Sequence, residues 1–160
     1  MRIGIIAVGR MKQGPERELV ARYLDRAVAS GKSLGLSNFT VTELSESRAS
    51  STAQRKAEEA RAIHEHLPRD GRLVALDEHG KSTGSEDFAH RLGRWRDDGA
   101  QSLSFVIGGA DGLDPAFVKQ ADLVLSFSPL TWPHQLVRIM LAEQLYRTTT
   151  ILSGHPYHRE

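Results

Sequence analysis

Short apolar runs rich in Ile and Val alternate along this chain with longer segments in which apolar residues recur at helical spacing. Parallel strands are buried on both faces and are joined by crossover helices, so they produce this kind of alternation. The pattern therefore predicts an α/β fold with a mostly parallel sheet and helices on both faces. The expected strands are residues 2–8, 39–44, 72–76, 103–107 and 123–126.

Two helices are expected between the first three strands. Pro15 suits the first turn of a helix over residues 15–30, because its missing N–H would have no partner there. The inward face of this helix is expected to carry Leu19, Tyr23 or Leu24, Ala27 and Val28. Ser51 and Gln54 have the spacing of a capping box, which predicts a second helix that ends near Pro68.

The last helix is expected to begin at Pro133, with Thr131 or Trp132 near its cap. Apolar residues at helical intervals predict that it buries Leu136, Val137, Met140, Leu141 and Leu145. Its arginines, Arg138 and Arg147, are expected to point away from the core. Shorter helical patterns cover residues 85–98 and 115–121.

Composition limits the class of protein. The length of 160 residues fits a single domain over residues 1–160. The net charge of +1 lacks the strong basic excess of a self-sufficient nucleic-acid binder. The chain has no Cys, which excludes disulfides and thiolate zinc sites and fits a reducing compartment. No apolar segment approaches the ~20 residues of a membrane span, so we expect a soluble, cytoplasmic protein.

Two segments that follow expected strands are candidate binding loops. Gly108 and Gly109 come directly after a strand, where a missing Cβ lets a ligand approach the backbone. Their spacing to Gly112 does not match a dinucleotide fingerprint, and on the residues alone an ordinary turn is an equal interpretation. Residues 127–132 are too apolar for an ordinary exposed loop, so they either pack as core or surround a ligand of mixed polarity.

The C-terminal segment is unusually rich in functional side chains. Chain ends are normally the least ordered part of a domain. Here the last helix leads into His155, Tyr157, His158, Arg159 and Glu160. Such a concentration of imidazole, phenol, guanidinium and carboxylate groups indicates a tail that acts on a substrate.

These segments together resemble the bacterial ribosomal RNA large subunit methyltransferase H family, of the SPOUT class. The resemblance covers the whole chain and includes Ile3–Gly9, Val74–Asp77 with Gly80-Lys81, Phe105–Gly112, Leu125–His134 and the tail. It implies a methyltransferase that uses S-adenosylmethionine to modify N3 of a pseudouridine in large-subunit (23S) ribosomal RNA. It also implies a homodimer and a SPOUT-type fold with a C-terminal trefoil knot, which is a rare exception among protein folds.

The resemblance assigns site residues to this chain. Backbone groups at three places would hold the cofactor, namely Leu76, Gly108 and the run Phe127, Ser128, Pro129, Leu130, Thr131 and Trp132. The glycine turn, this loop and the tail would then be three walls of one pocket, and the tail of one subunit would serve the cofactor of the other.

The catalytic assignments follow from the chemistry that the implied reaction requires. N3 of a uracil ring carries a proton that must leave, and negative charge develops on the flanking carbonyl oxygens. His158 would accept or relay the proton, since imidazole titrates near neutral pH. Arg159 would steady a carbonyl or phosphate, Tyr157 would stack on or bond the base, and Glu143 would orient Arg or His partners.

A low net charge implies docking on an assembled large subunit or ribosome, with phosphate contacts from local arginines. The candidates for these contacts are Arg10, Arg17, Arg22, Arg138 and Arg147. No metal is expected, because His64 with His66 and His155 with His158 are pairs without a third ligand at fixed spacing. Two alternatives stay open, a non-catalytic ribosome-binding module and an α/β enzyme that acts on a small metabolite.

Overall fold

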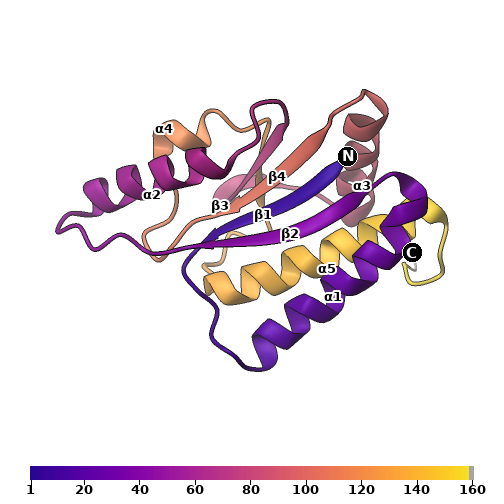
Figure 1. The fold of residues 1–160 in the computed structure, drawn as a ribbon, viewed down its shortest axis with the longest axis horizontal. Coiled ribbons are helices and arrows are strands. Elements are labelled where there is room, and N and C mark those ends of the chain that lie inside the picture. Colours follow the sequence, from indigo (N-terminus) through magenta and orange to yellow (C-terminus); the bar gives the residue numbers. More distant parts are fainter. Residues whose placement is uncertain (159–160) are drawn as a thin grey trace.

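A computed structural model describes residues 1–158 and contains one five-stranded sheet (Figure 1). The strands are β1 (Arg2–Val8), β2 (Ser37–Leu44), β3 (Arg72–Ser82), β4 (Ser102–Ile107) and β5 (Leu123–Ser126). Their order in the sheet is β2-β1-β4-β3-β5, and every neighbouring pair is parallel. The predicted parallel α/β sheet is therefore confirmed.

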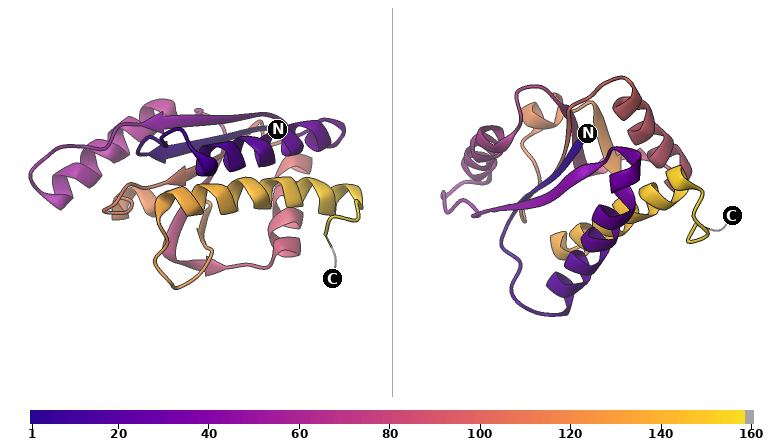
Figure 2. Two further views of the ribbon diagram at one scale, coloured as in Figure 1. Left: turned by 90° about the horizontal axis from the view of Figure 1, so that it is seen from below. Right: turned by 45° about the vertical axis from the view of Figure 1, so that its right-hand side comes forward.

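Helices cover both faces of this sheet (Figures 1 and 2). They are α1 (Pro15–Gly31), α2 (Thr52–His66), α3 (Ser85–Asp97), α4 (Pro115–Val118) and α5 (His134–Ser153), with a 3-10 turn at Lys32–Leu34. Ile3 and Ile5 of β1 pack against α1, α3 and α5 on one face. Ile6 and Val8 face α2 and α4 on the other, as strand alternation requires.

The first two helices begin as the sequence predicts, but the buried stripe of α1 differs. Pro15 occupies the first turn of α1, and the Ser51 hydroxyl accepts a hydrogen bond of 3.2 Å from the Gln54 N–H at the start of α2. The buried positions of α1 are Val20, Leu24, Ala27 and Gly31. Val28 lies beside this stripe and is 48 % exposed, so its predicted burial was wrong.

Strand β3 is longer than the predicted strand, which ended at Leu76. Pairing with β5 is interrupted after Leu76 and resumes at Lys81, so that Leu125 faces both residues. A Cβ on Gly80 would lie 2.8 Å from the backbone carbonyl carbon of Leu125, so this extension needs glycine to pass so close to β5. The polar sequence of the extension carried no strand pattern, which explains the missed boundary.

Two other boundaries differ by a few residues. Strand β2 begins at Ser37, two residues earlier than predicted, because Ser37 pairs with Arg2 of β1. Helix α4 ends at Val118 rather than at Ala121, and the chain continues through tighter turns in which the Ala121 N–H bonds the Val118 carbonyl.

Helix α5 is the longest helix and begins at His134, one residue later than predicted, because Pro133 is the capping residue instead of Thr131 or Trp132. Leu141 and Leu145 are buried as predicted. Leu136 is 40 % exposed, so its predicted burial was wrong. Among residues 1–158, no helix is long and apolar enough to cross a membrane.

Arg138 contradicts the expectation that the arginines of α5 point away from the core. It is 1 % exposed, and its guanidinium donates to Glu43 Oε1 over 2.5 Å and to the Gly9 carbonyl over 2.9 Å. Charge complementarity therefore draws this side chain under the ends of β1 and β2. A buried Arg138 has no free surface for a phosphate, which removes it from the predicted RNA contacts.

Candidate active site

A cavity of about 1110 Å³ opens at the carboxyl ends of β3, β4 and β5. Ligands of open parallel sheets bind at this edge. Of the predicted cofactor residues, the cavity is lined by Leu76, Gly108, Phe127, Ser128, Leu130, Thr131 and Trp132. Pro129 is the predicted residue that does not line it. Three segments that are distant in sequence therefore meet around one space.

The glycine turn after β4 forms one wall. The Gly112 N–H donates a hydrogen bond of 3.0 Å to the Gly109 carbonyl, and Gly112 has a φ of 77°. A Cβ on Gly108 would lie 2.8 Å from the carbonyl carbon of Gly112. The turn itself therefore requires glycine at 108, which adds a constraint to the predicted one of leaving room for a ligand.

The loop after β5 forms the opposite wall and is tied to the extension of β3. The Ser126 hydroxyl lies 3.1 Å from the Glu78 carbonyl and 2.9 Å from the Ser128 carbonyl. The Thr131 hydroxyl donates to Glu78 Oε2 over 2.8 Å. Leu130 is 66 % exposed at the rim. Hydrogen bonds to Glu78 therefore hold this loop in place. The sequence identified the loop only by its apolar composition.

Sequence reasoning missed several polar residues of the cavity. They are Lys56, Asp77, Glu78, His79, Asp111, Lys119 and His134. The residues that follow strand ends could have been predicted, because loops at this edge of a parallel sheet form binding sites. Lys56 could not have been predicted from the sequence, since it lies within an amphipathic helix and reaches the cavity only because of how α2 packs.

A second polar cluster gathers three of the four predicted catalytic residues. Glu143 Oε1 accepts hydrogen bonds from the Tyr157 hydroxyl over 3.1 Å and from Arg147 Nε over 3.0 Å. Arg147 Nη1 lies 3.2 Å from His158 Nδ1, and His158 Nε2 lies 3.5 Å from Glu86 Oε1. Arg147 was not among the predicted catalytic residues. Arg159 lies outside the described residues.

Electrostatics in this tail cluster favour a neutral phenol and a charged guanidinium. Burial, with the nearby Glu143 carboxylate, raises the pKa of Tyr157 to about 12. The hydrogen bond with Glu143 raises the pKa of Arg147. The Arg147 guanidinium lies 4.9 Å from the centre of the Tyr157 ring, within cation–π range. Glu143 therefore holds an arginine and a tyrosine in fixed protonation states.

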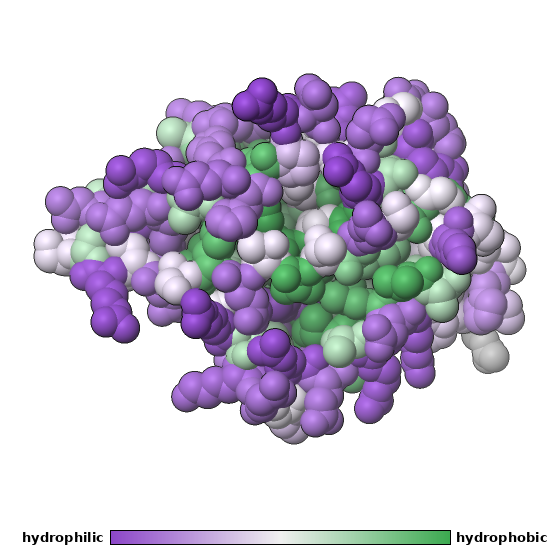
Figure 3. Space-filling model, viewed as in Figure 1, coloured by the Kyte–Doolittle hydropathy of each residue, from purple (hydrophilic) through white to green (hydrophobic). Residues whose placement is uncertain are grey.

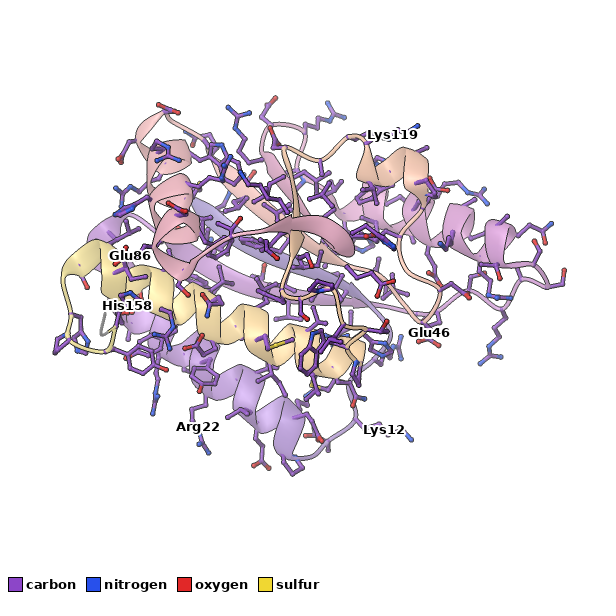
Figure 4. All side chains as sticks on the ribbon, turned by 180° about the vertical axis from the view of Figure 1, so that it is seen from behind. Lys12, Arg22, Glu46, Glu86, Lys119 and His158 are labelled. Atoms are coloured by element: carbon purple, nitrogen blue, oxygen red, sulfur yellow. The ribbon has the colours of Figure 1, made fainter. Side chains whose placement is uncertain are left out.

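The tail cluster does not border the cavity of its own chain. Val137 is the last residue of α5 that lines the cavity. The tail cluster is built on Glu143 and Arg147, about 9 and 15 Å further along a helix that rises ~1.5 Å per residue. Figure 4 shows His158 and Glu86 at the left of the molecule, away from Lys119 of the cavity lining at the upper right. Within one chain, the described part of the tail, residues 154–158, therefore does not form the expected third wall.

Residues 1–158 contain no group of three or more His, Cys, Asp or Glu side chains placed to hold a metal ion. His64 and His66 are exposed on α2, as expected.

Comparison with known proteins defines the class. A family model described as "Predicted SPOUT methyltransferase" matches residues 1–158. Ribosomal RNA large subunit methyltransferase H of Allorhizobium ampelinum is 61% identical, and that of Brucella anthropi is 58% identical, each over 99% of both chains. The crystal structure of a probable methyltransferase from Bordetella pertussis shares the fold, with a TM-score of 0.50, 16% identity and coverage of 92% of this chain and 95% of that chain.

Fold, cavity and family model together define a SPOUT methyltransferase. Within that class, the chain belongs to the family of ribosomal RNA large subunit methyltransferase H.

Proposed function

We propose that this protein transfers the methyl group of S-adenosylmethionine to N3 of a pseudouridine in large-subunit (23S) ribosomal RNA. The observation that carries the proposal is the cavity at the carboxyl ends of three parallel strands. Its walls contain every residue that the family resemblance assigns to the cofactor, with the exception of Pro129.

The residues of the cavity fit S-adenosylmethionine chemically. Leu76, Phe127 and Trp132 supply an apolar surface for the adenine, and the backbone around Gly108 supplies hydrogen-bonding groups. The loop after β5 carries no Lys or Arg. The cavity is lined by two lysines, Lys56 and Lys119, and also by the carboxylates of Asp77, Glu78 and Asp111, which favour the positive sulfonium. The volume of about 1110 Å³ is above the ~300–1,000 Å³ of typical small-molecule pockets, which leaves room for a target base beside the cofactor.

When bound, the cofactor supplies a methyl group activated by the sulfonium. N3 of the base would take this methyl group from the sulfur and would lose its proton. We propose that His158 accepts or relays this proton. Arg159 and Tyr157 would stabilise the base or a phosphate. Glu143 positions Tyr157 through the bond of 3.1 Å.

We further propose that the active form is a homodimer in which the tail of one chain completes the cavity of the other. The distance between tail and cavity within one chain supports this arrangement. Leu130, Trp132 and Leu136 are exposed apolar residues next to the cavity. Figure 3 shows a separate hydrophobic area across the middle of the face seen in Figure 1, whereas the loop of residues 127–132 lies behind that face. Exposed apolar patches of this kind are typical of interaction surfaces.

The trefoil knot of the SPOUT class is proposed for this chain on the same family grounds. Two contacts support this proposal, because they bring separate segments of the chain close together near the cavity. The extension of β3 passes β5 so closely that Gly80 has no room for a Cβ. The loop that leads into α5 is bonded to the same extension through Thr131 and Glu78.

The substrate is proposed to be the assembled large subunit or ribosome in the cytoplasm. The net charge of +1 gives little non-specific affinity for RNA, so the shape of a folded particle must contribute. Arg10, Arg17 and Arg22 are exposed and remain available for phosphate contacts.

The test combines calorimetry with S-adenosylmethionine and methyl transfer to ribosomes that lack the modification, with the product mapped by mass spectrometry. We expect cofactor binding and methylation at N3 of one pseudouridine, with much weaker activity on protein-free RNA. Ribosome association without cofactor binding would instead indicate a non-catalytic module. Turnover of free metabolites without methylation of ribosomes would indicate a small-molecule enzyme.

A further inference from the structure

We propose that Arg55 and Glu59 of α2 are positioning residues that hold the turn Gly108–Gly112 in its cofactor-binding shape. The inference rests on the proposed cofactor site, and neither residue lines the cavity itself. Lys56 of the same helix does line it, so α2 lies directly behind this wall. The two side chains are four residues apart and therefore project from the same face of the helix.

Arg55 joins three segments of the chain. Its Nε donates to Asp111 Oδ2 over 2.6 Å and its Nη2 to Asp111 Oδ1 over 3.2 Å, a bidentate pair that fixes direction as well as distance. Its Nη1 donates to the Ala49 carbonyl over 3.1 Å. The Arg55 hydrogen bond also lowers the pKa of Asp111. The turn is thus tied both to α2 and to the loop that precedes α2.

Glu59 supports the neighbouring position of the turn. It is 7 % exposed, and its Oε1 accepts a hydrogen bond of 2.9 Å from the Ser47 N–H. Its other carboxylate oxygen, Oε2, lies 3.5 Å from the point that a Cβ of Gly109 would occupy. The carboxylate is therefore packed between the loop before α2 and the backbone of the turn.

The turn needs contacts from α2 because it makes few stabilising contacts of its own. The hydrogen bond from the Gly112 N–H to the Gly109 carbonyl is a single short-range contact. Glycines have no side chains to pack and lose the most conformational freedom when they are ordered. Asp111 is the charged side chain of the turn, and Arg55 holds it. The backbone around Gly108 can hold a cofactor without rearrangement only while these contacts persist.

The experiment measures the Kd for S-adenosylmethionine and the methylation kinetics of Arg55→Ala and Glu59→Gln. We expect Arg55→Ala to weaken cofactor binding about tenfold, as expected when one partner of a charge-assisted pair is removed. The KM for the cofactor should rise while kcat at saturating cofactor stays near that of the parent. The double variant Arg55→Ala with Asp111→Ala should bind the cofactor no more weakly than the weaker of the two single variants, because both side chains act through the same contact.

Arg72→Ala is the matched control. It breaks the Arg72–Asp122 pair of 2.7 Å, whose side chains are 44% and 27% exposed and do not line the cavity. We expect this variant to bind the cofactor like the parent. If Arg55→Ala fails to fold, Arg55→Lys keeps the charge and loses the bidentate geometry, and it should show an intermediate loss of affinity.

Trp132→Ala separates failure of this proposal from failure of the proposed site. Loss of cofactor binding in Trp132→Ala, together with parental affinity in folded Arg55 and Glu59 variants, would overturn the positioning role and leave the site standing. Parental affinity in all of these variants would remove the cavity as the cofactor site. Equal loss of affinity in Arg72→Ala would show a general effect of stability and would also overturn the proposal.

Discussion

Arg138 and Glu43 form an ion pair of 2.5 Å in which the arginine side chain is 1% exposed and the glutamate 22%. Glu43 Oε1 also accepts a hydrogen bond of 2.8 Å from the Met11 N–H. The pair therefore joins α5 to the end of β2 and to the segment after β1. It anchors the helix that carries both Val137 of the cavity and the tail cluster.

Replacement of Arg138 by Ala should lower the free energy of unfolding by about 3 kcal/mol, because it leaves Glu43 without its buried partner. Urea denaturation monitored by circular dichroism measures this change. Arg17→Ala is a useful comparison, since Arg17 approaches Glu43 only to 3.8 Å from a half-exposed position. Similar, small effects in both variants would contradict a structural role for the buried pair.

The Tyr157 phenol should ionise at a higher pH than an ordinary tyrosine. Burial raises its pKa to about 12 from the ordinary 10.0, so its contribution to stability is complete below pH 10 and is lost as the pH rises toward 12. Ultraviolet titration of phenolate in the folded protein should show a step near pH 12 that is missing in Tyr157→Phe. If the spectra of the two proteins differ by a step near pH 10, the phenol is not held by the tail cluster.

Deletion of residues 156–160 should abolish methyl transfer and leave the fold and cofactor binding largely intact, because residues 156–158 do not line the cavity of their own chain. An experiment with mixed dimers tests whether the tail of one chain completes the cavity of the other. Truncated protein should regain activity when it forms dimers with a cavity variant such as Trp132→Ala, since one site of the mixed dimer keeps both parts. Activity of the truncated protein alone would show that the tail has been misassigned.

Gly108→Val should weaken cofactor binding by more than about tenfold, or ~1.4 kcal/mol. The structure adds a second expectation, because a Cβ at this position would lie 2.8 Å from Gly112 of the same turn. Calorimetric melting should therefore shift downward as well. Gly84→Ala is the control, because no atom lies within 4 Å of the position of its Cβ. Parental affinity in a normally melting Gly108→Val protein would exclude the turn from the site.

The sequence by itself determined the parallel sheet and the segments at its carboxyl edge. Runs such as Ile3–Val8 are buried on both faces, so their composition alone marks them as strands. The cap formed by Ser51 is equally local, since its partner is three residues away. The turn after β4 and the apolar loop after β5 follow directly from strand ends and were therefore found as candidates.

Tertiary structure decided the features that depend on partners distant in sequence. The extension of β3 is polar and becomes a strand only because β5 offers it hydrogen-bonding groups. Arg138 is buried because Glu43 and the Gly9 carbonyl satisfy its charge from 95 and 129 residues away. Arg55 meets Asp111 across 56 residues for the same reason. A sequence pattern records the polarity of a side chain, whereas packing determines which charge it meets.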